Sequence, residues 1–367
     1  MALKDKSVDP EEMKNEIDPP PIVRKLENDK RTLKKRVNEL KMQLGENENY
    51  FLELNDAISS FDPSEFKAIG KSSRNTKISN PMSAVFLFSD WHIGECIEPD
   101  EIEGFNEFSW AIAKARVSHM INSFCDWVDA ARQAGTIDEC VVLVAGDFIS
   151  GSIHEELTVT NEFPVPIQIV KAGHLLGWAI AELSRKFEKV RVENVVADNH
   201  SRLTRKPQYK QAGMNSYNYT IGWIAQKVVE SFKNVEYNLH PVIKKIVEVQ
   251  GIKYLVQHGN TIQGWSGFPW YGADRQVSRE AKARMNMDNK GFHKMVIGHF
   301  HVPMKTQSYI VNGSLSGTSE LDHGMGRHSD PCQVGWLAHP KFGEYSFSEF
   351  WLNHVDHTKN DTSSKDL

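Results

Sequence analysis

The sequence predicts an α/β fold in which short strands alternate with helices. Runs rich in β-branched residues recur between residues 83 and 302, and stretches long enough for a helix separate them. The expected strands are 84–90, 139–147, 189–200, 252–259 and 294–301, and the expected helices are 107–133, 166–187, 216–232 and 273–287. Three later runs follow one another without helices and indicate added antiparallel strands, at 309–315, 334–340 and 344–352.

The segment ahead of this region has a different texture. Residues 1–21 are polar and rich in proline at their end, which is typical of a disordered lead-in. Residues 22–60 are predicted to be helical, because Val23–Leu44 carries residues in alternating steps of three and four that are apolar except for Lys30. This pattern predicts a coiled coil that forms a homodimer or binds a partner protein. The alternative is a single amphipathic helix that packs on the main body.

The remaining boundaries follow from composition. Residues 61–82 have the proline, glycine, serine and lysine content of a linker. Residues 83–352 form the main domain, and residues 353–367 are expected to be a disordered tail.

Composition excludes several classes of protein. The chain has 367 residues, of which 40% are hydrophobic, enough for one large domain with appendages. A net charge of -5 means that any nucleic-acid binding must come from a local basic patch. The four cysteines form no CxxC pair, which argues against a disulfide framework and favours a reducing compartment. Because neither a signal peptide nor a membrane-spanning run is evident, we expect a cytoplasmic protein without membrane association.

Five successive expected strands end in residues that bind metals or move protons. In α/β sheets such groups gather where the carboxyl ends of the strands meet. His299 and His301 lie two residues apart, so in a strand both side chains would point to the same side. A pair of surface histidines would explain this one ending, but five in a row favour a shared site. The residues are Asp90, His92, Asp147, Asn199, His200, His258, His299 and His301.

The ordered motifs DxH, GD, NH, a lone histidine and GHxH, from Asp90 to His301, resemble the calcineurin-like metallophosphoesterase superfamily. The resemblance implies a four-layer sandwich of two packed, mainly mixed β-sheets flanked by helices, with residues 83–352 as the catalytic domain. The basic run after the NH motif is similar to phage-encoded members and to SbcCD-type repair exonucleases. A phage-encoded enzyme would act in the host cytoplasm.

The resemblance also implies two divalent metal ions that share Asp147, with manganese most expected and iron, zinc, nickel or magnesium as alternatives. One ion would also take Asp90, His92 and His301, and the other would take Asn199, His258 and His299. With only two anionic ligands, the pair of cations keeps a positive charge that attracts a phosphate group. A hydroxide bridging the ions would attack phosphorus, and His200 would stabilise the phosphate or protonate the leaving group.

Two departures from the family pattern concern His200. The glycine of the family's GNH motif is Asp198 here, and Ser201 stands where an acidic residue often follows the histidine. If the glycine is needed for a positive φ, aspartate is among the less unfavourable replacements. The carboxylate that would orient His200 is missing from its usual place.

Basic residues beside the expected site favour a phosphodiester in DNA as the substrate. Arg202, Arg205 and Lys206 follow His200 with no acidic residue among them and are predicted to bind the substrate. A second stretch, 265–284, combines aromatic with basic residues, as single-strand-binding sites do. It could instead be a small core beneath a loop, followed by a solvated helix. We therefore expect a nuclease, with a phosphomonoesterase, a small-nucleotide phosphodiesterase or a non-catalytic metal-binding scaffold as alternatives.

Overall fold

The computed structural model describes residues 28–38, 41–42, 52, 81–263 and 268–355. The chain divides into two compact units, residues 1–56 and residues 57–367. In the first unit, residues 28–38 are helical and exposed. Part of the predicted coiled coil lies outside the described residues, as do the lead-in at 1–21, most of the linker and residues 356–367 of the tail. The coiled coil therefore stays a prediction.

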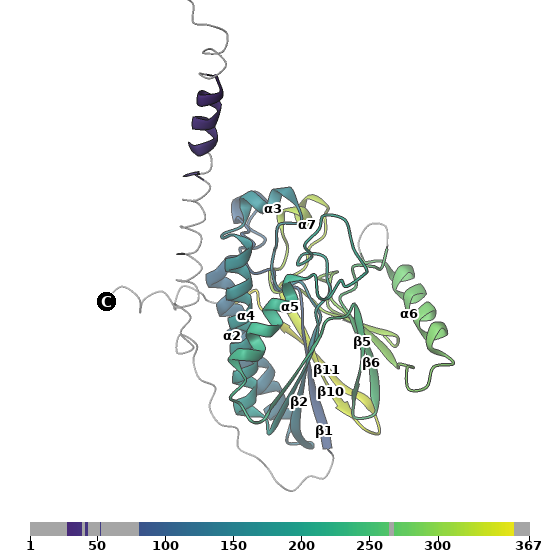
Figure 1. Ribbon diagram of the computed structural model, residues 1–367. Coiled ribbons are helices and arrows are strands. Elements are labelled where there is room, and N and C mark those ends of the chain that lie inside the picture. The colour runs from purple at the N-terminus through teal and green to yellow at the C-terminus, as the bar shows by residue number, and fades with distance from the viewer. Residues whose placement is uncertain (1–27, 39–40, 43–51, 53–80, 264–267, 356–367) are drawn as a thin grey trace, which may run out of the picture. The chain divides into compact units, whose positions relative to one another are not determined.

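The second unit contains two mixed β-sheets (Figure 1). The first has six strands in the order β11-β10-β1-β2-β3-β4. Parallel pairing joins β1 to β2, β2 to β3 and β3 to β4, whereas β10 and β11 add an antiparallel edge. The bounds are β1 (Pro81–Phe88), β2 (Thr136–Val144), β3 (Lys189–Val195), β4 (Val235–His240), β10 (Cys332–His339) and β11 (Gly343–Trp351).

The second sheet has five strands in the order β5-β6-β7-β9-β8. The pairs β6–β7 and β7–β9 are parallel, and the pairs β5–β6 and β8–β9 are antiparallel. The bounds are β5 (Lys244–Val249), β6 (Ile252–Gln257), β7 (Lys294–Ile297), β8 (Met304–Lys305) and β9 (Tyr309–Val311).

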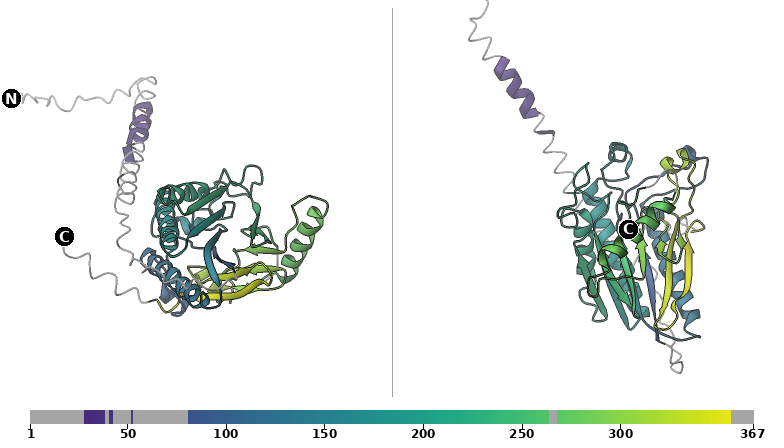
Figure 2. Two further views of the ribbon diagram at one scale, coloured as in Figure 1. Left: turned by 90° about the horizontal axis from the view of Figure 1, so that it is seen from below. Right: turned by 90° about the vertical axis from the view of Figure 1, so that its right-hand side faces the viewer.

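Helices cover the outer face of each sheet, which confirms the expected four-layer arrangement (Figures 1 and 2). Three long helices lie on the first sheet: α2 (Trp110–Ala131), α4 (Val165–Lys186) and α5 (Tyr217–Val228). The helix α6 (Trp270–Arg284) packs on the second sheet. The short elements are η2 (Pro99–Ile102), α3 (Glu155–Thr160) and α7 (Glu320–Gly324). None of the helices in the described part of the chain is long and apolar enough to cross a bilayer.

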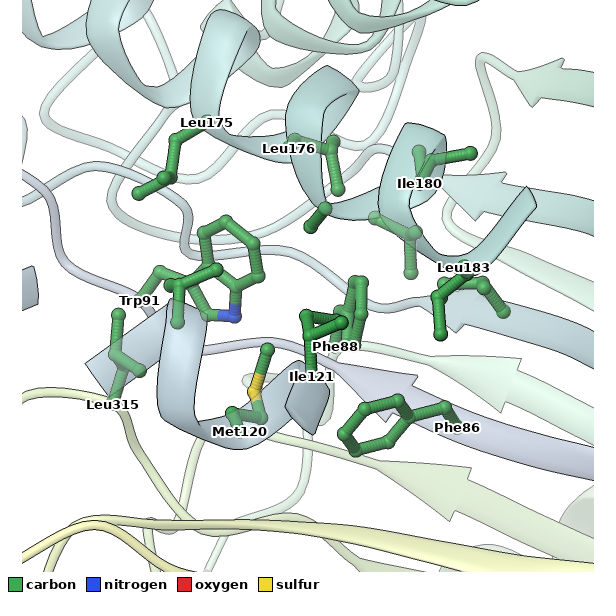
Figure 3. Packing of buried hydrophobic residues seen from close by; sticks show 14 of the residues in the cluster. Phe86, Phe88, Trp91, Met120, Ile121, Leu175, Leu176, Ile180, Leu183 and Leu315 are labelled. Atoms are coloured by element: carbon green, nitrogen blue, oxygen red, sulfur yellow. The ribbon is translucent and has the colours of Figure 1, made fainter. Parts of the chain in front are cut away.

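Strand β1 shows how the sequence builds these layers. Alternate side chains of a strand point to opposite faces, so a strand between two covered faces is apolar throughout. Phe86 and Phe88 pack against the helices of the first sheet, as Figure 3 shows for the contacts around Trp91 and Ile121. Val85 and Leu87 lie in the core between the two sheets. Burying a side chain of this size contributes about 1.5–3 kcal/mol.

One polar contact also joins the sheets in this inner core. The indole Nε1 of Trp336 on β10 donates to the hydroxyl of Tyr254 on β6 at 3.0 Å, and both side chains are buried. A directional hydrogen bond therefore fixes the position of one sheet relative to the other, in addition to apolar packing.

The predicted elements differ from the structure at several points. Strand β1 begins at Pro81, two residues inside the predicted linker. Strands β4 and β5 were not predicted, because their half-exposed edge positions mix polar and apolar residues. Strand β9 pairs in parallel with β7, so not every later run adds an antiparallel strand. A short helix, α7, interrupts those runs.

Candidate metal centre

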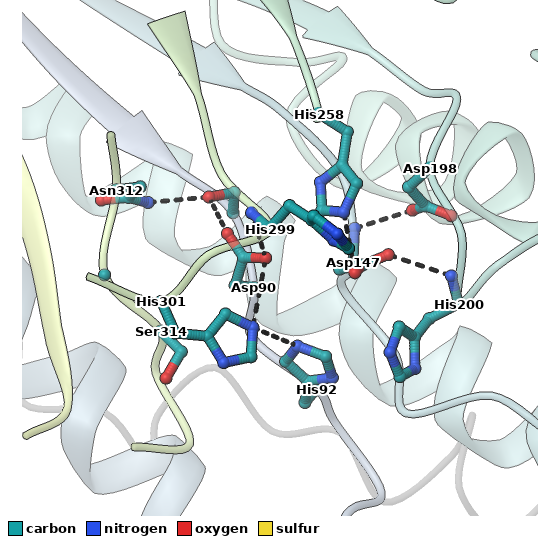
Figure 4. Close-up of polar contacts among 12 residues, drawn as sticks. Asp90, His92, Asp147, Asp198, His200, His258, His299, His301, Asn312 and Ser314 are labelled. Atoms are coloured by element: carbon teal, nitrogen blue, oxygen red, sulfur yellow. Dashed lines mark hydrogen bonds and ion pairs between the residues drawn. The ribbon is translucent and has the colours of Figure 1, made fainter. Parts of the chain in front are cut away.

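The eight residues that were predicted from the strand ends lie together, in loops at the carboxyl ends of five strands, and all except Asn199 are labelled in Figure 4. The first sheet supplies the loops after β1, β2 and β3, and the second sheet supplies those after β6 and β7. The centre thus draws on both sheets. Parallel strands bring these loops to one edge even though they are far apart in the chain.

The backbone at this centre is unusual. Five of the candidate residues adopt a positive φ: Asp90 (58°), His92 (48°), Asp147 (52°), His299 (69°) and His301 (59°). Each such residue costs about 1–3 kcal/mol, and such conformations cluster at functional sites. The expectation that His299 and His301 share one side of a strand is wrong, because β7 ends at Ile297. Their left-handed turns, not strand pleating, aim the two rings.

The first group of possible metal ligands comprises Asp90, His92 and His301. The Nε2 atom of His301 lies 3.2 Å from Nε2 of His92 and 3.5 Å from Oδ1 of Asp90. Asp90 is fully buried, and its Oδ1 accepts the main-chain N–H of His299 at 2.9 Å. The backbone turn from His299 to His301 is also held at His301, because the Ser329 hydroxyl donates to the His301 carbonyl at 2.5 Å.

The second group comprises Asp147, His258 and His299. The Nε2 atom of His258 lies 2.9 Å from Oδ2 of Asp147 and 3.0 Å from Oδ1 of Asn199. The Nδ1 atom of His258 is 2.8 Å from the carbonyl of Ala145, which accepts its proton. Burial lowers the pKa of His258, but the Asp147 carboxylate outweighs burial and raises it to about 10.

His200 belongs to a third group with His92 and Asp147. Its ring centroid lies 4.6 Å from that of His92, and its main-chain N–H donates to Oδ1 of Asp147 at 3.1 Å. The Nδ1 atom of His200 lies 2.7 Å from the carbonyl of Ser150. This carbonyl orients the ring in place of the missing carboxylate. A backbone acceptor leaves no signal in the sequence.

Asp198 is a structural member of the centre that sequence reasoning noted only as a departure. Its Oδ2 accepts the main-chain N–H of Asp147 at 2.7 Å and also bonds the Asn218 amide, while its Oδ1 accepts the N–H of Ser201 at 2.8 Å. Asp198 does not adopt a positive φ, so this position does not require the family's glycine. Burial, followed by the charge of Asp147, raises the pKa of Asp198 to about 7.

The three basic residues after His200 are mostly engaged within their own loop. The guanidinium of Arg202 donates to the carbonyls of Thr204 and Arg205 at 2.9 and 2.8 Å. Arg205 forms an exposed ion pair with Glu155 of α3 at 2.5 Å. Lys206 is exposed. Arg202 thus braces its own loop and Arg205 links that loop to α3, and the assignment of the three residues to substrate binding stays a prediction.

The aromatic stretch divides into a buried and an exposed part. Phe268 packs on Phe300 and Tyr309 in the small core beneath α6, with ring centroids 5.0 and 5.8 Å apart. Trp270 and Tyr271 are 57% and 77% exposed. Trp265 lies outside the described residues.

Comparison with known proteins adds little. No family model matches the sequence, and no curated protein matches it. Among solved structures, a predicted phosphoesterase from Streptococcus pneumoniae TIGR4 aligns at 12% identity and a TM-score of 0.28, covering 74% of this chain and 98% of that one. Vacuolar protein sorting 29 from Cryptosporidium parvum aligns at 14% identity with a TM-score of 0.30 and the same two coverages.

Phosphopantetheinyl hydrolase from Mycobacterium tuberculosis aligns at 12% identity with a TM-score of 0.24, covering 64% of this chain and 90% of that one. At TM-scores of 0.30 and below, such alignments carry no conclusion about this chain. Its fold and candidate centre rest on the layers, contacts and distances described above.

Proposed function

We propose that this chain is a dinuclear-metal phosphoesterase that hydrolyses phosphodiester bonds in DNA. The observation that carries the proposal is the overlap of the three ligand groups. His92 is common to the first and third groups, and Asp147 is common to the second and third. The third group thus links the first group to the second, as a site for two neighbouring cations that share the Asp147 carboxylate would require.

The donor set fits divalent cations. Because the Nδ1 proton of His258 is donated to Ala145, a neutral His258 presents a lone pair at Nε2 to two oxygen acceptors, those of Asp147 and Asn199. Only a cation or a second ring proton relieves this contact. In the first group, the 3.2 Å between the Nε2 atoms of His92 and His301 suits two ligands of one ion. With ligand bonds of about 2.1 Å, such nitrogens lie about 3.0–3.4 Å apart.

Asp90, His92, Asp147 and His301 would hold one ion, and Asp147, Asn199, His258 and His299 the other. Bound cations of this kind polarise a phosphoryl oxygen and lower the pKa of water. Mixed nitrogen and oxygen ligands suit manganese, with iron, zinc, nickel or magnesium as alternatives.

His200 would hold a proton at Nε2 for the leaving oxygen. Its Nδ1 proton is committed to Ser150, so Nε2 is the ring nitrogen left to act. Asp147 and Ser150 fix the ring from two sides through the main-chain N–H and Nδ1 of His200. Such positioning holds the ring in one orientation before a substrate arrives.

The test is a substrate panel with purified protein. Metal-depleted protein would be reloaded with Mn²⁺, Ni²⁺, Zn²⁺ or Mg²⁺ and offered a phosphomonoester, bis(p-nitrophenyl) phosphate, and single- and double-stranded DNA. We expect metal-dependent cleavage of the diester and of DNA, and Asp147→Asn should abolish it. Intact DNA together with rapid monoester hydrolysis would refute the nuclease.

A phosphomonoesterase or small-nucleotide phosphodiesterase is the second candidate, favoured because Arg202 is engaged within its own loop and Arg205 pairs with Glu155 of α3. In that case Arg202→Ala would affect small diesters and DNA equally, whereas a selective loss on DNA would support the nuclease. A homodimer or partner complex through Val23–Leu44, and a cytoplasmic location, are part of the same proposal.

A further inference from the structure

Helix α6 carries a single exposed stripe of one aromatic and three basic side chains. Tyr271, Arg275, Arg279 and Lys282 follow one another in steps of four, four and three residues and are all exposed. Side chains at such steps lie on one face of a helix. With a rise of 1.5 Å per residue, the stripe is about 16 Å long. The opposite face of α6, with Ala273 and Val277, packs on the second sheet.

The stripe's charges are uncompensated in the part of the chain that the structure describes. Neither Arg275, Arg279 nor Lys282 forms an ion pair with a described carboxylate. Arg275 instead lies over the ring of Tyr271, 5.4 Å from its centroid. Of the helix's two acidic residues, Glu280 is buried and pairs with Lys244 and Arg284, which leaves Asp274 as the one exposed acid.

A series of ring contacts connects the start of the stripe to the candidate metal centre. The ring of His299 lies 4.9 Å from that of Phe300, Phe300 lies 5.0 Å from Phe268, and Phe268 lies 5.0 Å from Trp270. Trp270 adjoins Tyr271 at the first turn of α6, and both rings are more than half exposed. A chain bound at the centre could therefore continue over Trp270 and Tyr271 onto α6.

We infer that this stripe binds a single-stranded polynucleotide leading to or from the centre, with one base stacked on Tyr271 or Trp270 and successive phosphates on Arg275, Arg279 and Lys282. Aromatic platforms next to a basic track are the hallmark of sequence-tolerant single-strand binding. The inference rests on the proposed nuclease function and deepens it. It adds α6 to the substrate contacts proposed for the loop of Arg202 and Arg205.

The test measures binding separately from cleavage. Full-length protein would be titrated in EDTA against a fluorescein-labelled DNA strand of about 12 nucleotides, its duplex and the same strand as RNA. Each phosphate contact on a single strand contributes about 0.7 to the slope of log K against log salt. The variant Arg275→Ala/Arg279→Ala/Lys282→Ala should therefore lower that slope by about 2.

Two further variants separate stacking from charge. Tyr271→Ala should weaken single-strand binding at least about 5-fold, whereas Tyr271→Phe, which keeps the ring, should bind like the wild type. A control for the loss of exposed positive charge elsewhere is Lys189→Ala/Lys227→Ala, two exposed basic residues on β3 and α5. All these positions are solvent-exposed, and alanine favours a helix, so α6 should fold in each variant.

If the triple variant had the same salt slope and the same affinity as the wild type, the proposal that the stripe binds a single strand would be refuted. Tighter binding to the duplex than to the single strand would refute it as well. Tighter binding to RNA would instead overturn DNA as the substrate. Turnover of bis(p-nitrophenyl) phosphate with Mn²⁺ tests the proposed function independently. Its absence, with the binding pattern intact, would refute the phosphoesterase but leave the stripe standing.

Discussion

Replacing Asp198 gives the sharpest test of how this centre is held. Its carboxylate accepts three buried donors: the N–H groups of Asp147 and Ser201 and the side-chain amide of Asn218. A buried donor that loses its partner costs about 1–3 kcal/mol. Three such losses in Asp198→Ala total about 3–9 kcal/mol. The variant also no longer buries a carboxylate beside Asp147, and this gain offsets part of the loss. We therefore expect a loss near the low end, about 3 kcal/mol.

Asp198→Asn is the informative companion, because its amide oxygen can keep the two donors at the Oδ2 position and fail only at Ser201. Its unfolding free energy should fall by about 1–2 kcal/mol. Urea unfolding of the metal-free protein measures both values, with Asp126→Ala on the exposed face of α2 as the control. If Asp198→Ala costs less than about 1 kcal/mol, or no more than the asparagine variant, the three bonds do not brace the centre.

Three further outcomes are expected. A divalent cation at 100 times its dissociation constant should stabilise the protein by about 2.7 kcal/mol, read as a rise in melting temperature that Asp147→Asn removes. His200→Asn should lower turnover of a small diester at least about 100-fold while the melting temperature is kept; activity within twofold would exclude a proton-transfer role. Burial raises the pKa of Glu193, but hydrogen bonds from His240 and Arg191 outweigh burial and lower it. Its bonds thus stabilise the fold above the usual glutamate pKa, and the urea midpoints of wild type and Glu193→Gln should converge as the pH falls through the lowered pKa. A gap that does not narrow as the pH falls below the usual glutamate pKa would contradict this.

The alternation of strands and helices was enough to predict the α/β class, and the family resemblance added the four layers. Both are confirmed. Strand β1 was visible because both of its faces are buried, so its sequence is apolar apart from Ser83. Strands β4 and β5 lie at sheet edges, where one face meets solvent, and their mixed residues hide the period.

The candidate centre could be anticipated as a set of residues but not as a geometry. The structure brings the eight predicted side chains together, and their metal-binding roles stay predictions. The left-handed turns at His299 and His301 could not be read from sequence, because non-glycine residues seldom adopt them. The Ser150 carbonyl that orients His200 was equally hidden, since every residue has a carbonyl.

The division of the ligands between two sheets has a mechanical consequence. The loops of the second sheet carry His258, His299 and His301, whereas the loops of the first sheet carry Asp90, His92 and Asp147. Cations bound by these residues would cross-link the two sheets at this edge, and a relative shift of the sheets would separate their ligands. The buried hydrogen bond between Trp336 and Tyr254, which also joins the sheets, would then contribute to the affinity for the ions.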